Sequence, residues 1–347
     1  MKRIIAAALA ALMLFAFASC GTEPKDTGVT TTTTTVKGNT DTTPTPTDRT
    51  VDIKVLGGPT GMGISKLWND SKNGNTALKY NFSVTASPDA EYLADIKKGE
   101  FDIAALPTNV AAKLYNTGAP IQIAAVNTLG VLYVLEAADT PTIKSVADLK
   151  GKTIYTTGQG ATPEYALRYI LSSNGIDPDN DVNIIYETDG SLVIADIKKG
   201  DASVVMLPEP AATNVQKVTN AKVVLDVTEE WNKIAGEGND LMQGCVVVSN
   251  KFVSEHKDLL DTFLAEYDAS VKYVNENQSE AAQMIVDLQI LSVSAEVAQT
   301  AINGSKITYV DGDAMKTALL KVYEVLFNAD NASIGGKIPD ENIFYKK

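Results

Sequence analysis

Residues Ala94–Gly99 read Ala-Asp-Ile-Lys-Lys-Gly, and the same six residues return at Ala195–Gly200, 101 positions further along the chain. The same shift places Leu106-Pro107 on Leu207-Pro208 and aligns residues 51–127 with residues 152–228 without a gap. Nine of the 21 positions from residue 94 to residue 114 are identical. Internal repeats usually reflect a repeated structural unit. We therefore expect two similar lobes, with a small-molecule cleft between them.

Within each copy, strand-like and helix-like stretches alternate, which predicts α/β lobes built on parallel sheets that are covered on both faces. In the first copy, Ser87 is the expected N-cap and Pro88 the first residue of a helix that ends at Gly99. In the second copy, Thr162 is the expected N-cap and Pro163 the first helical residue. The expected strands are residues 51–56, 81–86, 101–106 and 121–126, and in the second copy residues 153–156 and 202–207.

Four loops follow the carboxyl ends of the expected strands. In open parallel sheets a ligand lies beyond these ends, at the point where the strand order reverses. A strand order of 2-1-3 in each lobe would place that point between the first and third strands. The expected walls of the cleft are then Gly57–Gly63, Pro107–Asn109, Gly158–Thr162 and Pro208–Pro210. A glycine loop taken alone is better explained as a simple tight turn. Four loops in matching topological positions reverse that preference and favour a binding cleft.

The first 50 residues resemble an export signal followed by a spacer. Lys2-Arg3, the apolar run Ile4–Phe17 and the small residues before Cys20 predict a signal peptide over residues 1–19, with Cys20 lipidated after cleavage. The alternative is an ordinary secreted protein. Residues 20–50 are rich in threonine and predict a solvated tether. Cys245 is then left without a partner for an intramolecular disulfide.

Composition excludes several functions. A net charge of −13 argues against nucleic-acid binding, which needs a basic surface. The single histidine, His256, excludes a multi-histidine metal site and argues against a histidine-based catalytic triad. No G-x-x-x-x-G-K-[ST] loop is present to bind ATP. We expect no catalytic residues, no metal and no cofactor.

The chain resembles the substrate-binding lipoproteins of ABC importers, in the branch that binds nitrate, sulfonates, taurine and thiamine precursors. The resemblance rests on the lipobox at Cys20, the threonine-rich spacer, and the segments Gly57–Gly63, Ala104–Asn109 and Gly160–Tyr165. It implies a type II periplasmic-binding-protein fold, with two doubly wound lobes joined by two crossing strands. It also implies a monomer, anchored by lipid at the outer face of the cytoplasmic membrane, that delivers a small molecule to a permease with a separate ATPase subunit.

The resemblance also allows the lobes to be delimited. Crossings are expected at Ile121–Leu135 and Leu241–Val246. Residues 51–127 and 246–347 would then form lobe 1 with the C-terminal helices, and residues 128–245 would form lobe 2. Thr128 and Gln243 would lie near the hinge, where they either face the cleft or satisfy local backbone groups.

The cleft loops suggest a ligand class, because none of them contains lysine or arginine, the usual partners of an anion. Glu209 and Glu164 instead stand at expected helix starts, where a carboxylate favours a ligand with N–H donors, such as a pyrimidine vitamin precursor. The alternative is that both only complement helix dipoles, which leaves a sulfonate, nitrate or other small anion as the ligand. The candidate ligand-binding residues are Gly58, Thr60, Met62, Gly63, Thr108, Asn109, Thr128, Gln159, Gly160, Thr162, Glu209 and Gln243.

Two functions of other classes remain open at this point. An exported enzyme on the same fold would need a catalytic constellation, which the motifs do not supply. A surface adhesion or structural lipoprotein would explain the spacer but not the repeated cleft loops.

Overall fold

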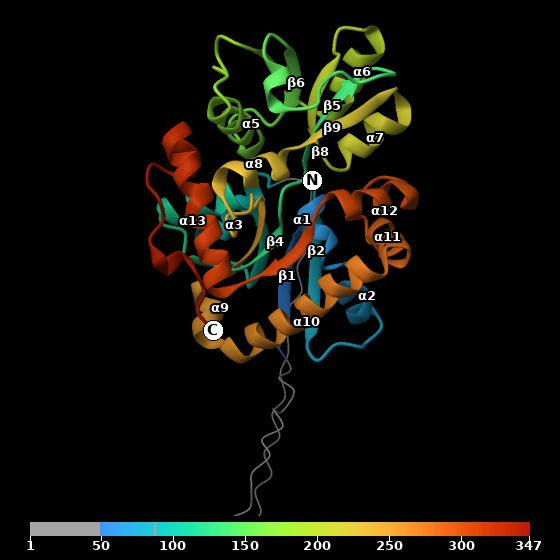
Figure 1. Ribbon diagram of the computed structural model, residues 1–347. Coiled ribbons are helices and arrows are strands. Elements are labelled where there is room, and N and C mark those ends of the chain that lie inside the picture. Colours follow the sequence, from blue (N-terminus) through green and yellow to red (C-terminus); the bar gives the residue numbers. More distant parts are fainter. Residues whose placement is uncertain (1–48, 87) are drawn as a thin grey trace, which may run out of the picture. The chain divides into compact units, whose positions relative to one another are not determined.

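The computed structural model describes residues 49–86 and 88–347, and these residues contain two β-sheets with helices on both faces of each (Figure 1). The expected signal peptide, Cys20 and nearly all of the expected tether lie outside the described residues. Arg49 is already part of the fold, because its guanidinium forms two 2.8 Å hydrogen bonds with the carboxylate of Asp102. None of the helices among residues 49–86 and 88–347 is both long and apolar enough to cross a bilayer.

The first sheet has six strands in the order β11-β4-β10-β3-β1-β2. Strands β1, β2 and β3 are parallel, whereas β10 is antiparallel to both β3 and β4. In β10, Cys245 and Val247 join one hydrophobic core while Val246 and Val248 join the other, as expected for a strand buried on both faces. The strands are β1 Thr50–Leu56, β2 Lys79–Thr85, β3 Ile103–Pro107, β4 Ile121–Thr128, β10 Gly244–Ser249 and β11 Ile307–Val310.

The second sheet has five strands in the order β7-β6-β8-β5-β9. Its parallel core β7-β6-β8 has the same 2-1-3 order as β2-β1-β3, so the expected strand order and switch points are confirmed. The fold class is likewise as expected, with two doubly wound lobes whose chain crosses twice between the sheets. The strands are β5 Leu132–Ala137, β6 Thr153–Thr157, β7 Asn183–Glu187, β8 Val204–Pro208 and β9 Ala221–Asp226.

The expectation of wholly parallel sheets is wrong, because an antiparallel strand is inserted in each sheet, β10 in the first and β5 in the second, and the edge strand β11 of the first sheet is also antiparallel to its neighbour β4. The reason is geometric. A chain that arrives from the other lobe enters at the carboxyl edge of the parallel strands, so it can only run along the sheet in the opposite direction. The crossings therefore convert a parallel sheet into a mixed one.

Helices cover both faces of each sheet (Figure 1). The core against one face of the first sheet contains side chains of α2, α9, α10, α11 and α12, and the core against the other face contains side chains of α3, α4 and α13. This second core continues into the second lobe through α5 and α8, while α6 and α7 pack on the far face of the second sheet. The helices are α1 Pro59–Met62, α2 Ser65–Lys72, α3 Ala90–Lys98, α4 Thr108–Asn116, α5 Thr162–Ser173, α6 Gly190–Lys199, α7 Ala211–Val218, α8 Val227–Ala235, α9 Asn250–Glu255, α10 Lys257–Glu276, α11 Gln278–Asp287, α12 Ala295–Gly304 and α13 Gly312–Ala329. Short 3-10 turns are η1 Val146–Leu149, η2 Asn331–Ile334 and η3 Glu341–Ile343.

The repeated Lys-Lys-Gly segments end helices α3 and α6, as the sequence predicts. Gly99 and Gly200 adopt φ values of 75° and 85°, the left-handed conformation that closes a helix at glycine. The expected helix starts are wrong by one or two residues. Helix α3 begins at Ala90, because the Asp89 side chain accepts the amide of Tyr92 and so supplies the cap. Helix α5 begins at Thr162 with Ala161 as the N-cap residue.

Candidate functional site

The carboxyl ends of the parallel strands in both sheets meet at the two segments that cross between the lobes. The first crossing runs from the end of β4 at Thr128 to the start of β5, and the second precedes β10. Gln243 ties the two together, because its amide donates to the Thr128 carbonyl at 3.0 Å and its Oε1 accepts the Val131 amide at 2.8 Å. We call this region the junction.

Each sheet also sends the loop after its third parallel strand into the junction. On the first lobe, the amide of Thr108 donates to the Gln243 carbonyl at 3.0 Å, and Thr108 Oγ1 donates to the Met242 carbonyl at 2.8 Å. On the second lobe, the amide of Glu209 donates to the Val131 carbonyl at 2.9 Å. Both loops therefore lie where the sequence predicts them, beyond the carboxyl ends of β3 and β8.

Polar side chains of the first lobe are packed closely at the junction. Asn127 Nδ2 donates to the Thr60 carbonyl at 3.0 Å, and Thr128 Oγ1 donates to Asn127 Oδ1 at the same distance. Gly244 faces this group, and a Cβ atom there would lie 2.4 Å from Thr60 Cγ2 and 2.6 Å from Asn127 Oδ1. Only glycine leaves room for these side chains to converge.

One side-chain hydrogen bond joins the two lobes at the centre of the junction. Thr162, the first residue of α5, donates through Oγ1 to Oδ1 of Asn109 on α4, at 3.3 Å. Both side chains are buried. This bond is long for an O–H donor, so a ligand that offers better partners to Thr162 and Asn109 would replace it at low cost.

Glu209 is the buried carboxylate of the junction, with 6% of its surface exposed. The carboxylate accepts two hydrogen bonds from Thr213, from the amide at 3.1 Å and from Oγ1 at 3.0 Å. Burial raises the pKa of Glu209, and the bonds from Thr213 offset this only in part. Among the described residues no ammonium or guanidinium forms an ion pair with it.

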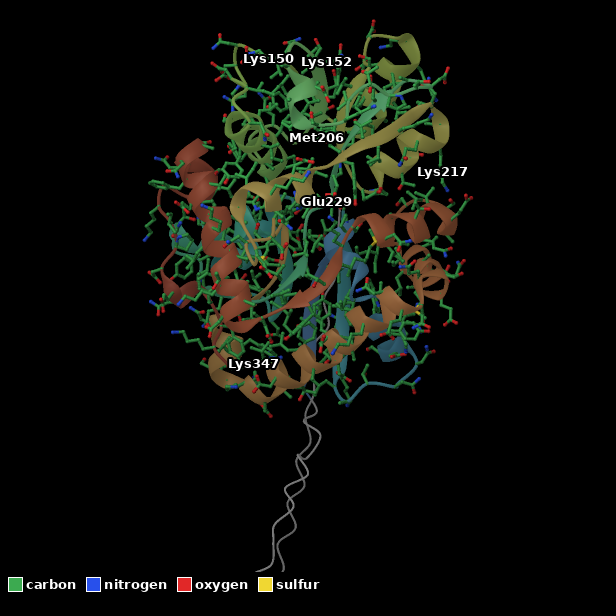
Figure 2. All side chains as sticks on the ribbon, in the orientation of Figure 1. Lys150, Lys152, Met206, Lys217, Glu229 and Lys347 are labelled. Atoms are coloured by element: carbon green, nitrogen blue, oxygen red, sulfur yellow. The ribbon has the colours of Figure 1, made fainter. Side chains whose placement is uncertain are left out.

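The surroundings of Glu209 are acidic. Tyr133, on β5, has its pKa raised by burial and then by the nearby carboxylates of Asp226, Glu209 and Glu229. Lys306 forms an ion pair with one of these carboxylates, because its Nζ lies 2.7 Å from Asp226 Oδ2. Asp226, Glu209 and Glu229 thus place three carboxylates near Tyr133 on this side of the junction, and Figure 2 shows Glu229 at the level where the two lobes adjoin.

The remaining candidate residues do not join this group. Met62 is fully buried in the core beneath β1, and Gly63 lies against Val271 and Tyr267 of α10. Gln159 and Gly160 are exposed at the tip of their loop. Glu164 accepts the amide of Gly160 at 2.7 Å, which agrees with a local role at the start of α5.

Gly58 lies at a surface hollow of about 960 Å³, formed by the ends of β1 and β2 and the loop between α11 and α12. Its φ of 98° belongs to the left-handed region, and its amide donates to the Ile290 carbonyl at 3.1 Å. The hollow reaches Ser294, the N-cap residue of α12. In that helix Glu296 lies 2.9 Å from Lys217 of α7, and Figure 2 labels Lys217.

Sequence reasoning missed Tyr133, Asp226 and the turn Gly304–Lys306. The turn carries a visible signal, since the sequence Asn-Gly-Ser-Lys before a β-branched stretch is typical of a break between a helix and a strand. Nothing in that pattern indicates that the turn reaches the other lobe, because the residues that it contacts there are at least 75 positions away in the chain.

The chain has the two-lobed type II periplasmic-binding-protein fold, with its buried polar side chains at the switch points of both sheets. The chain matches the family model described as NMT1/THI5 like over residues 84–281, more than half of its length, and it belongs to that family. No curated protein matches the chain.

Several solved structures are similar in fold. A protein described as an ABC transporter from Parabacteroides distasonis is 23% identical with a TM-score of 0.70, and the match covers 86% of this chain and 100% of the other. The periplasmic aliphatic sulphonate binding protein SsuA from Escherichia coli is 14% identical with a TM-score of 0.65, covering 87% and 95%. The periplasmic nitrate-binding protein NrtA from Synechocystis PCC 6803 is 14% identical with a TM-score of 0.56, covering 85% and 86%. Identities this low establish a common fold.

Proposed function

We propose that the chain is the substrate-binding component of an ABC importer, which captures a small solute at the junction and presents it to a permease. The observation that carries this proposal is the convergence of buried polar side chains from both lobes on the two crossing segments. These side chains are Thr108, Asn109, Asn127, Thr128, Thr162 and Glu209. Buried polar groups normally belong to a network that satisfies them, and here that network spans the line along which two lobes separate.

Binding without chemistry accounts for the residues at the junction. They are hydroxyls, amides and one carboxylate, and the only histidine of the chain, His256, lies between α9 and α10. The sequence has no ATP-binding loop, so the energy for transport comes from a separate ATPase subunit. The two lobes close on the solute, and the closed form is the one that the permease receives.

We assign the solute to small molecules that carry N–H donors or a positive charge, with a pyrimidine as the specific candidate. Glu209 supports this assignment, because it is buried without an ion-pair partner in the described part of the chain and can accept from a cation or an N–H group. The negative charge around Tyr133 acts in the same direction. A bound donor would lower the pKa of Glu209 and so offset the burial of its charge.

The second candidate is a small anion. It is favoured by the structures similar in fold that are named for binding aliphatic sulphonate and nitrate. The junction would then have to hold the anion with backbone amides and the hydroxyls of Thr108 and Thr162, since lysine and arginine are absent from the expected cleft loops.

Isothermal titration of a Cys20→Ser chain with thiamine-related pyrimidines, amines, sulfonates and nitrate tests the proposal. We expect one class to bind, and Glu209→Gln to weaken a pyrimidine or amine by about tenfold to a hundredfold, as expected for a charge-assisted hydrogen bond. Glu91→Gln, an exposed residue in the first turn of α3, is the matched control and should bind as the parent does. A sulfonate or nitrate that binds equally well to both variants would keep the importer and reject the role of Glu209.

The proposal also includes the setting of the protein. Cys20 would carry the lipid that holds the chain at the outer face of the cytoplasmic membrane, and residues 128–245 would form the second lobe of a monomer. Mass spectrometry of the membrane-extracted protein tests the lipid, since a Cys20→Ser chain should lose the acyl mass. Release of wild-type protein without acyl mass would contradict the anchor.

A further inference from the structure

The turn at the end of α12, in the first lobe, contacts residues of the second lobe. Gly304 is the last residue of α12, and its carbonyl accepts the Tyr133 hydroxyl of β5 at 2.6 Å. Two residues later, Lys306 Nζ lies 2.7 Å from Asp226 Oδ2. Lys306 adopts a φ of 44°, a conformation that residues with side chains rarely hold unless their surroundings fix it. The turn that ends α12 therefore makes two polar contacts with the other lobe.

Gly304 also touches the carboxylate of the junction. A Cβ atom at this position would lie 2.5 Å from Oε1, 2.9 Å from Cγ and 3.0 Å from Cδ of Glu209. These separations are shorter than any ordinary contact, so a side chain at residue 304 and the observed position of Glu209 exclude each other. The backbone itself does not demand glycine, because residue 304 is helical, and alanine is the better helix former.

Glu209 cannot simply move aside. Its carboxylate is held by the two hydrogen bonds from Thr213, and it is buried. Moving it would break bonds to a charged acceptor in a buried place, which are expensive to lose. The alternative is a small separation of the lobes on this side, where the contacts that give way are polar, namely those of Tyr133 and Lys306.

The opposite side of the junction resists separation. There one hydrophobic core runs without a break from the first sheet to the second, through Tyr323 of α13 and Tyr165 of α5. The Tyr165 hydroxyl also donates to Asp330 at 2.8 Å. Opening this side would expose apolar surface to water, whereas opening the α12 side would mainly exchange polar contacts for water.

We propose that Gly304 is a positioning residue that sets how far the two lobes close and fixes Glu209 in its binding position, an inference that rests on the proposed function. In the closed form the α-carbon of Gly304, which carries no side chain, packs against the Glu209 carboxylate, and the Gly304 carbonyl accepts a hydrogen bond from the Tyr133 hydroxyl. The lobes hinge about the apolar core of α13 and α5 and part at α12 and α7. Any side chain at residue 304 acts as a wedge on the side that opens.

Cross-linking across the side that opens tests the proposal without a ligand. Lys217 and Glu296 face each other at 2.9 Å, and replacing both by cysteine in a Cys20→Ser chain allows a short bis-maleimide to join them when the lobes are closed. The rate of cross-linking then follows the closed population even when that population is small. We expect Gly304→Ala to lower the rate by at least about tenfold. Gln299→Ala, on the exposed side of the same helix, should leave the rate unchanged.

A double variant identifies the contact responsible. Glu209→Asp shortens the carboxylate side chain by one methylene, so adding it to Gly304→Ala should restore the cross-linking rate to near that of the parent. An unchanged rate in Gly304→Ala overturns the proposal, and so does a reduced rate that Glu209→Asp fails to restore. Thermal unfolding serves as the control for misfolding: the alanine variant should still unfold in a single cooperative transition, because only polar contacts at the boundary between the lobes are lost.

A titration then separates this inference from the function on which it rests. With any compound that binds the parent, Gly304→Ala should raise the Kd by at least about tenfold, and an unaltered Kd contradicts the positioning role. If no compound binds the parent, the proposed function fails while the cross-linking result still decides whether Gly304 governs closure.

Discussion

Asp226 supports two interactions with different oxygen atoms, and substitutions can separate them. Oδ1 accepts the amides of Thr228 at 2.8 Å and Glu229 at 3.2 Å, which caps the start of α8. Oδ2 receives the ammonium of Lys306 from the other lobe. Asparagine is as good an N-cap as aspartate but carries no charge. Asp226→Asn should therefore weaken only the contact between the lobes, whereas Asp226→Ala should remove both interactions.

The magnitudes follow from the exposure of the pair. The side chains of Lys306 and Asp226 are 29% and 16% exposed, so their ion pair should contribute about 1 kcal/mol, at the upper end of the range for surface pairs. Loss of an N-cap costs about 1 kcal/mol. We expect Asp226→Asn to lower the free energy of unfolding by about 1 kcal/mol, and Asp226→Ala by about 2 kcal/mol.

Urea unfolding of the parent, Asp226→Asn, Lys306→Met and the double variant gives the coupling energy of the pair. We expect about 0.5–1 kcal/mol, reduced in about 1 M NaCl where surface charges are screened. The pair Lys321–Glu324, which lies within α13 and joins no lobes, is the matched control. A coupling no larger than that of the control, or Asp226→Ala as stable as Asp226→Asn, would refute the reasoning.

Three further predictions concern buried ionisable groups. Because burial raises the pKa of Glu209, affinity for a cationic or N–H-donating ligand should fall as the pH is lowered through that raised pKa; titration calorimetry at pH values from 8 downwards should show the fall, and Glu209→Gln should abolish it. Burial acts to raise the pKa of Glu136, but hydrogen bonds from residues 142–143 outweigh it and hold the pKa below its usual range. The stabilisation from Glu136 is therefore present above its unfolded pKa and is lost as the pH falls through the lowered one, so Glu136→Gln should cost about 2 kcal/mol in urea unfolding at pH 7 and less near pH 4. Burial also raises the pKa of the Cys245 thiol, so a Cys20→Ser chain should not react with a thiol reagent until it is unfolded.

Each of these has an outcome that contradicts it. A pH-independent Kd in the parent would mean that Glu209 is not in contact with the ligand. Equal loss of stability in Glu136→Gln at both pH values would mean that its charge does not matter. Rapid labelling of Cys245 in the native chain would show that the strand β10 opens to solvent.

The glycine ends of α3 and α6 and the presence of two similar lobes could be predicted because they depend on local chemistry and on the repeat, whereas the strand order 2-1-3 was a supposition that the structure confirms. Lysines followed by glycine end a helix wherever they occur, and two copies of one pattern imply two copies of one fold. The helix starts were less accurate, because Asp89 and Ala161 compete with neighbouring residues that are nearly as suitable for the cap. Which residue becomes the cap depends on which side chains form other contacts in the folded protein. Thr162, for example, donates its hydroxyl to Asn109.

The candidate site was predicted in part. The loops after β3 and β8 bring Thr108, Asn109 and Glu209 to the junction, since the carboxyl ends of parallel strands share one edge of a sheet. Met62 shows why the rest could not be predicted: a methionine in a cleft loop and a methionine under a sheet have the same local sequence, and only the packing of α10 over β1 buries it.

The sequence by itself determined the two-lobed α/β architecture and the position of the polar loops, because these follow from periodicity, turn chemistry and an internal repeat. The two crossings were implied by the family resemblance. Only the tertiary structure decided that β5 and β10 run antiparallel to their neighbouring strands, that Gly304 contacts Glu209, and that Lys306 forms an ion pair with Asp226. These features join residues between 68 and 145 positions apart. Their pairing depends on how two sheets are oriented about the crossings, and no local preference of the chain encodes that orientation.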